Sequence, residues 1–477
     1  MSLGRVQRCV LSAVPIAFAF TTQLLCAADP PAAGGPPGYF RDIRPILQNH
    51  CLGCHQPAKA EGSYVMSADF AGLLKGGESG EAAIVPGKPD ESHILAMVAP
   101  ADGKAEMPKD KPPLAADQIE KLRAWIAAGA TDDTPASVRA LVDALHPPLY
   151  EGAPVINAID FSSDDALLAV SGYHETLLFA GDGSALVARL VGQSERVQSV
   201  AFSPNGQLLA VTGGSPGRLG ELQVWDVASR QLKYSVSVTF DIVYGASWSH
   251  DGAKIAFGCA DNTVRAVDSA TGQQLLYQGA HSDWVLDTVF SLDSSHLVSV
   301  GRDRSMKLIE VATQRFVDNI TSITPGALKG GIGAVARHPQ KEDLLIGGAD
   351  GTPKVYQMHR TKARQIGDDF NLIKAYDPLP GRIYDVNFRA DGARFVVGSS
   401  LDGTGEVRVY ETDSGKMLVK MAGQTGPVFA VAFSKSGKFV ACGGFDGLVR
   451  LYDAESGQLV KEFSPVPPGA IKVAAAN

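Results

Sequence analysis

Residues 197–211 read Val-Gln-Ser-Val-Ala-Phe-Ser-Pro-Asn-Gly-Gln-Leu-Leu-Ala-Val. The stretch predicts a strand that ends at the aromatic Phe202, a tight Ser-Pro-Asn-Gly turn and a second strand. The position of Phe202 recurs at intervals of 41 to 51 residues, and arginine replaces the aromatic residue once. The seven positions are Phe161, Phe202, Trp248, Phe290, Arg337, Phe388 and Phe433. This spacing is typical of the blades of a β-propeller.

Each repeat continues with two more predicted strands. An Asp-containing turn such as that at Asp446 precedes a third strand, for example residues 449–453, and a fourth strand follows, as at residues 458–463. Four strands in each of seven units predict an all-β, seven-bladed propeller over residues 154–463. Closing the sheets into a ring removes the exposed edges that one open sheet of this size would have.

Two units carry specific marks, Leu-Gln-Val-Trp-Asp at residues 222–226 and Gly-Ala-His at residues 279–281. On these marks the repeats resemble the WD40 family. The resemblance implies that His281, Ser299 and Asp303 tie one blade together through buried hydrogen bonds. Among the seven units only the second keeps the third-strand tryptophan of the family, and Ile309 replaces it in the unit of His281. We therefore expect incomplete networks inside the blades.

The N-terminus carries a predicted export signal. Residues 9–25 form the one long apolar run, Arg5 and Arg8 precede it, and small residues follow it up to Ala28. This pattern is typical of a secretory signal peptide over residues 1–28 and predicts an exported, periplasmic or otherwise extracytoplasmic protein without a membrane span. The formal net charge of −8 argues against nucleic acid as a partner.

Shorter segments separate the signal peptide from the propeller and follow it. Residues 29–38 predict a Pro/Gly-rich leader, residues 131–153 a linker with a possible short helix at 138–145, and residues 464–477 a C-terminal tail. Residues 39–130 show helical spacing at both ends around a glycine- and proline-rich middle. The apolar stripes are Phe40, Ile43, Ile46 and Leu47 at one end and Ile119, Leu122, Trp125 and Ile126 at the other.

Residues 51–55 read Cys-Leu-Gly-Cys-His, a C-x-x-C-H motif. Two thiols at this spacing can add to the vinyl groups of haem while the adjacent histidine binds the iron. A thioredoxin-like pair would follow a strand, whereas a predicted helix over residues 40–49 leads into this motif, and no second Cys or His pair lies nearby to complete a zinc site. The motif therefore predicts one covalently bound haem c, held by Cys51, Cys54 and His55.

The second axial ligand of that haem has four candidates, Met66, His93, Met97 and Met107. Met107 is favoured because a proline follows it in an extended loop shortly before the last predicted helix. Met97 has the spacing of a core residue, and His93 is expected in the first turn of a helix that Asp90 caps. The other candidates and an open position remain as alternatives.

Further marks accompany the motif: residues 39–47 (Tyr-Phe-Arg-Asp-Ile-Arg-Pro-Ile-Leu), 73–77 (Leu-Leu-Lys-Gly-Gly), 85–89 (Val-Pro-Gly-Lys-Pro), 107–108 (Met-Pro) and 125–130 (Trp-Ile-Ala-Ala-Gly-Ala). With them, residues 39–130 resemble the planctomycete-type cytochrome c domain. The resemblance implies a small all-α domain in which His55 and Met107 bind the metal. Ala115 departs from the family, which usually caps the last helix with Ser or Thr, and we expect this to weaken the helix start by about 1 kcal/mol.

An iron with two protein ligands and no vacant position predicts one-electron transfer. We therefore expect an exported c-type cytochrome that is not an enzyme, with the propeller as a docking platform for protein, including a redox partner. Two alternatives stay open: a haem-dependent oxidoreductase with a substrate site in the propeller channel, and a haem-based redox or ligand sensor. The sequence names neither the electron donor nor the acceptor.

The innermost predicted strands of the propeller carry aromatic residues near their starts, at Tyr244, Trp284, Tyr384 and Phe429. These side chains are candidate anchors for a protein partner, or they pack loops over the channel. Asp287 and Asp385 occupy equivalent channel-facing positions, where we expect solvated carboxylates rather than a cation site. Cys259 and Cys442 are expected to be buried free thiols.

Overall fold

The computed structural model describes residues 36–51, 54–56, 59–66, 70–109, 111–134, 142, 146–322, 329–365, 367 and 369–471. The predicted signal peptide, most of the leader and nearly all of the predicted helix at residues 138–145 lie outside these ranges. Among the described residues no helix is both long and apolar enough to cross a membrane.

Antiparallel β-sheets make up most of the regular secondary structure of the described residues. The first sheet has seven strands: β3 (Ile159–Phe161), β4 (Leu167–Ser171), β5 (Tyr173–Ala180), β6 (Leu186–Phe202), β7 (Leu208–Ser215), β8 (Leu219–Asp226) and β9 (Gln231–Thr239). The start of β6 pairs with β5 and its end with β7, so β6 is the outer strand of the first blade and the inner strand of the second. This sheet therefore supplies two four-stranded blades.

Five separate four-stranded sheets supply the remaining blades. They are β10 (Val243–Trp248), β11 (Lys254–Cys259), β12 (Val264–Asp268) and β13 (Gln274–Gln278); β14 (Val285–Phe290), β15 (His296–Gly301), β16 (Met306–Glu310) and β17 (Arg315–Asn319); β18 (Ile332–Arg337), β19 (Asp343–Gly348), β20 (Lys354–Gln357) and β21 (Leu372–Ala375); β22 (Arg382–Phe388), β23 (Arg394–Leu401), β24 (Thr404–Glu411) and β25 (Met417–Met421); and β26 (Val428–Phe433), β27 (Phe439–Gly444), β28 (Val449–Asp453) and β29 (Leu459–Phe463).

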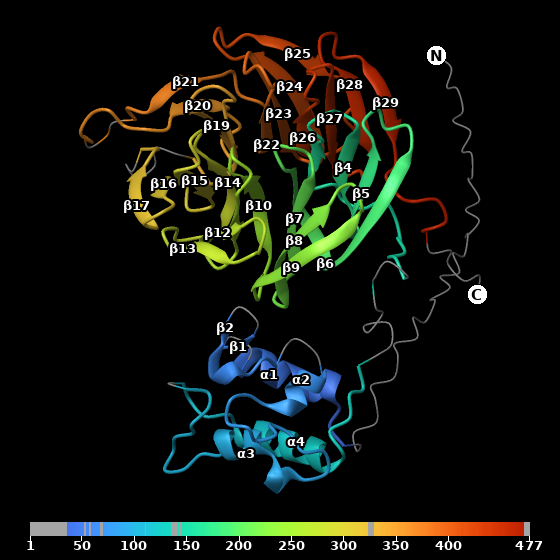
Figure 1. Cartoon of the computed structure of the whole chain (residues 1–477), viewed down its shortest axis with the longest axis vertical. Helices are drawn as coiled ribbons and strands as arrows, with labels where there is room; N and C mark the ends of the chain where they lie inside the picture. Colours follow the sequence, from blue (N-terminus) through green and yellow to red (C-terminus); the bar gives the residue numbers. More distant parts are fainter. Residues whose placement is uncertain are drawn as a thin grey trace, which may run out of the picture.

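The seven blades form a closed ring. The first strand of each blade contacts the first strand of the next, and β26 of the last blade contacts β3 of the first. Figure 1 shows β10, β14, β22 and β26 toward the middle of the ring and β13, β17, β21, β25 and β29 at its periphery. The predicted seven-bladed, WD40-like propeller is thus confirmed, because the repeat period and the turn residues together determine where each strand ends.

The fourth blade contains the hydrogen-bond network that the sequence predicts. His281 Nδ1 lies 3.0 Å from a carboxylate oxygen of Asp303, and His281 Nε2 lies 2.8 Å from the hydroxyl of Ser299. Ile309, in the place of the family's tryptophan, is fully buried among apolar side chains. The network therefore ends at Ser299, and hydrophobic packing replaces its last member.

Polar side chains on inner strands join neighbouring blades around the channel. Asp287 accepts a hydrogen bond from the backbone of Val335, and Asp385 accepts one from the backbone of Val431, in each case on the next blade. Each carboxylate also accepts one from the residue that follows it. Both residues are half-buried on the channel wall, and two backbone N–H groups hold each carboxylate, so they are not the freely solvated carboxylates that the sequence analysis expects. Without a side-chain acceptor on the inner strand, backbone N–H groups of the next blade would stay unpaired. This explains why aspartates occupy positions 287 and 385.

The N-terminal region contains short helices and one small pair of strands. They are the π-helix η1 (Tyr39–Ile43), α1 (Arg44–His50), the two-residue strands β1 (His55–Gln56) and β2 (Lys59–Ala60), the 3-10 helices η2 (Glu61–Ser63) and η3 (Pro89–Glu91), and α2 (Phe70–Lys75), α3 (His93–Val98) and α4 (Ala116–Ala127). Because β1 and β2 pair, the region is not purely helical as predicted. The helix expected over residues 40–49 is divided between η1 and α1, with Pro45 in the first turn of α1, where its missing N–H costs nothing.

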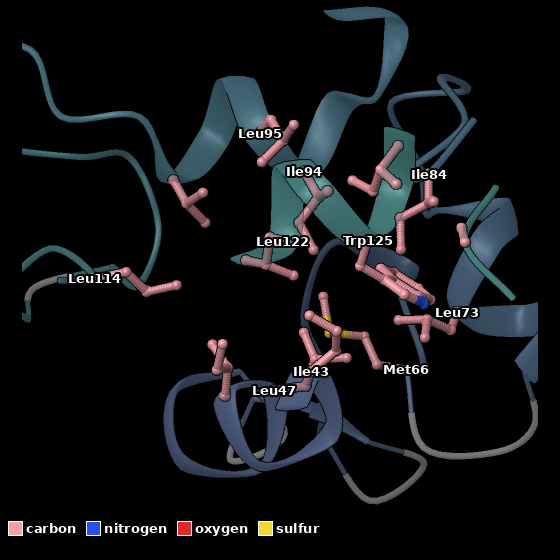
Figure 2. Close-up of a cluster of buried hydrophobic side chains, with 14 residues drawn as sticks. Ile43, Leu47, Met66, Leu73, Ile84, Ile94, Leu95, Leu114, Leu122 and Trp125 are labelled. Carbon is pink, nitrogen blue, oxygen red and sulfur yellow. The ribbon is translucent and has the colours of Figure 1, made fainter. Parts of the chain in front are cut away.

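The helices of this region share one hydrophobic core. Figure 2 shows Ile43 and Leu47 on one side of this core and Ile94, Leu122 and Trp125 on the other. Gly129 follows α4 with a φ of 101°, a conformation that glycine adopts without strain, and the next residue, Ala130, is still part of this core.

Two contacts join segments that are far apart in the sequence. Phe240, in the loop between β9 and β10, packs against the core of the N-terminal region. Tyr150, at the end of the predicted linker, donates its backbone N–H to the carbonyl of Ala470 in the predicted tail at 2.6 Å. The two cysteines expected in the propeller interior, Cys259 and Cys442, are fully buried and reduced, as predicted.

Candidate functional site

Two cavities contain the residues that the sequence singles out. The first, of about 230 Å³, lies in the N-terminal region. Cys51, Cys54, His55 and Met107 all line it. The structure therefore brings the four predicted site residues to one cavity, although Met107 lies more than fifty residues beyond His55 in the sequence.

His55 is held in one orientation. Its Nδ1 lies 3.0 Å from the backbone carbonyl oxygen of Glu61, and its ring centroid lies 5.4 Å from that of Tyr64. A carbonyl oxygen only accepts, so Nδ1 carries the proton and donates, and Nε2 keeps its lone pair. The hydroxyl of Tyr64 donates to the carbonyl of Leu73 at 2.5 Å, which fixes the neighbouring ring in turn.

Cys51 and Cys54 follow directly from the end of α1. The backbone N–H of Cys51 donates to Leu47, and that of Cys54 donates to Cys51, so the chain turns back on itself at this point. Burial raises the pKa of the Cys51 thiol to about 11, and the neighbouring thiol of Cys54 adds to the rise. Cys51 is therefore a neutral thiol at physiological pH and a poor nucleophile as it stands.

The four candidates for the second axial ligand all line the cavity but differ in their other contacts. Met66 is buried in the hydrophobic core. His93 Nδ1 lies 2.5 Å from a carboxylate oxygen of Glu81. Met97 and Met107 are both half-buried and line the cavity, and the backbone N–H of Met107 donates to the carbonyl of Met97. Met97 is therefore not the core residue that the sequence predicts.

The helix that carries His93 begins differently from the prediction. Ser92, rather than Asp90, is the N-cap residue of α3, and its hydroxyl contacts the backbone of residues 85 and 88 instead of capping the helix. Among the described residues no group of three or more His, Cys, Asp or Glu side chains could hold a metal ion.

The second cavity, of about 1050 Å³, is the central channel of the propeller. The aromatic residues that the sequence singles out lie at its mouth, where the inner strands begin, and they form two pairs. The rings of Tyr244 and Trp284 stack at 5.9 Å with an interplanar angle of 25°, and those of Tyr384 and Phe429 meet edge to face at 4.8 Å. Trp284 is 37% exposed and Tyr384 39% exposed, so these rings do not close the channel.

Sequence reasoning missed two arginines beside these rings. The guanidinium of Arg302 lies 4.6 Å from the ring centroid of Trp284, and that of Arg382 lies 5.9 Å from the centroid of Tyr384. The backbone N–H of Arg302 also donates to the carbonyl of Trp284. The sequence contains a weak indication of the contact between Arg382 and Tyr384. The two residues are two positions apart on one predicted strand, and side chains at that spacing lie on the same face.

Comparisons with known proteins concern both regions. A family model described as Planctomycete cytochrome C matches residues 51–111. This stretch holds the four predicted site residues, but it covers neither η1 and α1 nor α4. The resemblance of residues 39–130 as a whole is therefore supported only in this part.

Curated relatives align with a larger part of the chain. The Eukaryotic translation initiation factor 3 subunit I of Aspergillus oryzae is 26% identical over 313 residues, which are 64% of this chain and 79% of that protein. The protein of the same name from Coccidioides immitis is 26% identical over 309 residues, 62% of this chain and 77% of its own length. Both are named as subunits of a factor and not as enzymes, which is compatible with the predicted non-enzymatic role.

These relatives contradict the predicted exported, periplasmic cytochrome. Their name assigns them to translation initiation and carries neither haem, iron, electron transfer nor export. The same finding contradicts three further predictions. They are the covalent haem c, the one-electron function and the two haem-based alternatives. Those predictions rested on the C-x-x-C-H motif, on the family resemblance of residues 39–130 and on residues 1–28, which lie outside the described residues. The alignment with the relatives extends over 64% of the chain.

A second family model, described as Nucleolar protein 10-like, N-terminal domain, matches residues 193–474. This match includes six of the seven blades and extends into the predicted tail. Because it covers more than half of the chain, the protein belongs to the family of the Nucleolar protein 10-like, N-terminal domain, whose fold here is a WD40-like β-propeller.

Proposed function

We propose that the propeller is a non-enzymatic docking platform that holds protein partners in a larger assembly. The observation that carries this proposal is the open channel mouth with its exposed aromatic side chains, Trp284 and Tyr384. Large aromatic side chains on rigid strands contribute much of the binding free energy at protein interfaces. The name of the relatives adds support, because a subunit works as part of an assembly.

The test is the size of the native particle that contains the full chain. We expect the chain, purified gently from its own cells, to elute as a complex larger than its 50.1 kDa mass, with chemical cross-links between a reproducible partner and residues 154–463. Elution as a single chain without such cross-links would contradict the proposal.

We further propose that residues 39–130 form a domain of their own, joined to residues 154–463 by the linker 131–153, and that this domain holds a second binding site. Its residues are Cys51, Cys54, His55 and Met107, with His55 and Met107 as ligands of a metal ion. The support is their position on one cavity, the free lone pair of His55 Nε2, and the preference of thiols, thioethers and imidazoles for soft metal ions.

Metal analysis of the natively purified full chain tests this second site. We expect a bound metal that is lost in the double variant His55→Ala, Met107→Ala and kept in His50→Ala, whose imidazole lines the same cavity. The intact mass of the same sample reports any group held on Cys51 and Cys54. A metal content that is equal in all three proteins would refute the assignment.

A further inference from the structure

The channel mouth has a regular arrangement that points to the chemistry of its partner. One aromatic pair lies on the third and fourth blades and the other on the sixth and seventh, so the two pairs face each other across the ring. Each pair carries one arginine against an exposed ring, Arg302 on Trp284 and Arg382 on Tyr384. The mouth therefore has two facing sites, each built from an apolar surface and a cation.

Both arginines can accept an acidic ligand. The side chain of Arg302 is half exposed and lies 3.6 Å from Asp283, a long and solvated contact. Arg382 is exposed, and no carboxylate pairs with it among the residues that the structure describes. An arginine that stacks on an aromatic ring loses little conformational entropy when it binds a carboxylate through two hydrogen bonds.

The charges along the cavity favour the same ligand. Its lining includes four Arg or Lys side chains, Arg302, Arg337, Arg382 and Lys435, and four aspartates, Asp160, Asp283, Asp287 and Asp385, together with His250. Burial raises the pKa of Asp287 to about 7 and that of Asp385 to about 8, which leaves two aspartates to balance the four cations at slightly acid pH. The cavity is thus positive inside a chain whose formal net charge is −8.

We propose that the channel mouth binds an extended acidic peptide segment of a partner protein, with an apolar or aromatic residue between its carboxylates. In this arrangement Arg302 and Arg382 pair with the carboxylates, while Trp284 and Tyr384 contact the apolar residue. The proposal rests on the docking function proposed above and names the surface and the partner's chemistry. A nucleic acid is disfavoured, because a phosphate backbone requires a run of cations, whereas here Asp283 stands beside Arg302.

Fluorescence anisotropy with defined probes and the full chain tests the proposal. The probe is a labelled peptide of about ten residues, glutamate-rich with two phenylalanines, long enough to cross the mouth at about 3.4 Å per extended residue. Two comparison probes are used. One is the same peptide with lysine in place of glutamate, and the other is an oligouridylate of equal length. We expect the acidic peptide to bind, with an affinity that falls as salt rises, and the other two probes to bind at least about tenfold more weakly.

Variants locate the binding on the mouth. Arg302→Gln with Arg382→Gln, and separately Trp284→Ala with Tyr384→Ala, should each weaken the acidic peptide about tenfold or more. The matched control combines Tyr277→Ala with Arg315→Gln, two exposed residues on the outer strands β13 and β17, and should leave the affinity unchanged. Arg382→Lys keeps the charge without the planar fork and should fall between the wild type and the glutamine variant.

Several outcomes would overturn the inference. Absence of acidic-peptide binding, equal or tighter binding of the lysine peptide or of the oligouridylate, or an affinity that the mouth variants leave unchanged would each do so. Unfolding is excluded as the cause when a variant keeps the wild-type thermal midpoint. If the native assembly persists in the mouth variants, the docking function stands and this assignment of its surface fails alone.

Discussion

Asp385 shows how a single residue of the channel wall links structure to pH. Burial raises its pKa to about 8, although hydrogen bonds from the backbone N–H groups of Val431 and Val386 lower it in part. The folded protein therefore binds a proton that the unfolded chain has released above about pH 4. The resulting stabilisation is complete below the ordinary aspartate pKa and is lost as the pH rises through about 8.

We expect the free energy of unfolding to fall between pH 5 and pH 8, by up to about 1.4 kcal/mol per pH unit from this group. Asp385→Asn should flatten that slope and lower the stability at acid pH, because an amide nitrogen cannot accept one of the two backbone hydrogen bonds. Denaturant unfolding at several pH values measures both effects. Asp391→Asn is the control, since Asp391 has a lowered pKa and finishes its titration below this range. An unchanged slope in Asp385→Asn would show that another group causes it.

At the same scale, the sequence predicted some contacts and missed others for a clear reason. The hydrogen bonds of His281 followed from residue types at family spacing. The hydrogen bond between Asp385 and the backbone of Val431 did not, because an isolated aspartate on a strand looks the same in sequence whether water or the next blade lies beside it. The two arginines of the channel mouth, Arg302 and Arg382, were not predicted, because they come from different turns and strands of the ring.

At the scale of elements, the start of α4 lacks the usual side-chain cap. Ala115 occupies the N-cap position, and the side chain of Gln118 reaches back to accept the backbone N–H of Ala115 at 3.0 Å. The backbone carbonyl of Ala115 accepts the N–H of Gln118 at 2.9 Å, but the methyl side chain of Ala115 offers no acceptor to the first N–H groups of α4.

Ala115→Ser should supply that hydrogen bond and stabilise the N-terminal region by about 1 kcal/mol. Hydrogen exchange of the amides of α4 reports the gain as slower exchange. The control is Ala127→Ser, at the C-terminal end of the same helix. No unpaired backbone N–H lies there for the hydroxyl to accept, so this substitution should give no gain in stability. Equal effects of the two substitutions would mean that the hydroxyl acts through solvation and not as a cap.

Strand positions were more predictable than strand continuity. The predicted strand at residues 449–453 is β28 to the residue, because Asp and Gly turns delimit it. The sequence predicted four separate strands in each unit, whereas β6 runs through both the first and second blades. Its pairing with β5 shifts register, and the chain continues extended because two neighbours, β5 and β7, offer hydrogen bonds in succession.

At the scale of the whole molecule, the ring follows from the repeat, but contacts between distant segments do not. The packing of Phe240 against the N-terminal core and the pairing of Tyr150 with the segment at Ala470 depend on tertiary placement that no local pattern encodes. The functional prediction failed at this scale too. It took the chemistry of the C-x-x-C-H motif and the family resemblance of residues 39–130 for the role of the whole chain, while the curated relatives align over most of the sequence.

Hydrogen exchange of the native assembly, compared with that of the free chain, tests docking at the channel mouth most directly. We predict slower exchange in the complex at the starts of the inner strands, around Tyr244, Val285, Tyr384 and Phe429, with the outer strands β13, β17 and β21 unchanged. Protection confined to the outer strands, or absent from the propeller altogether, would contradict the account.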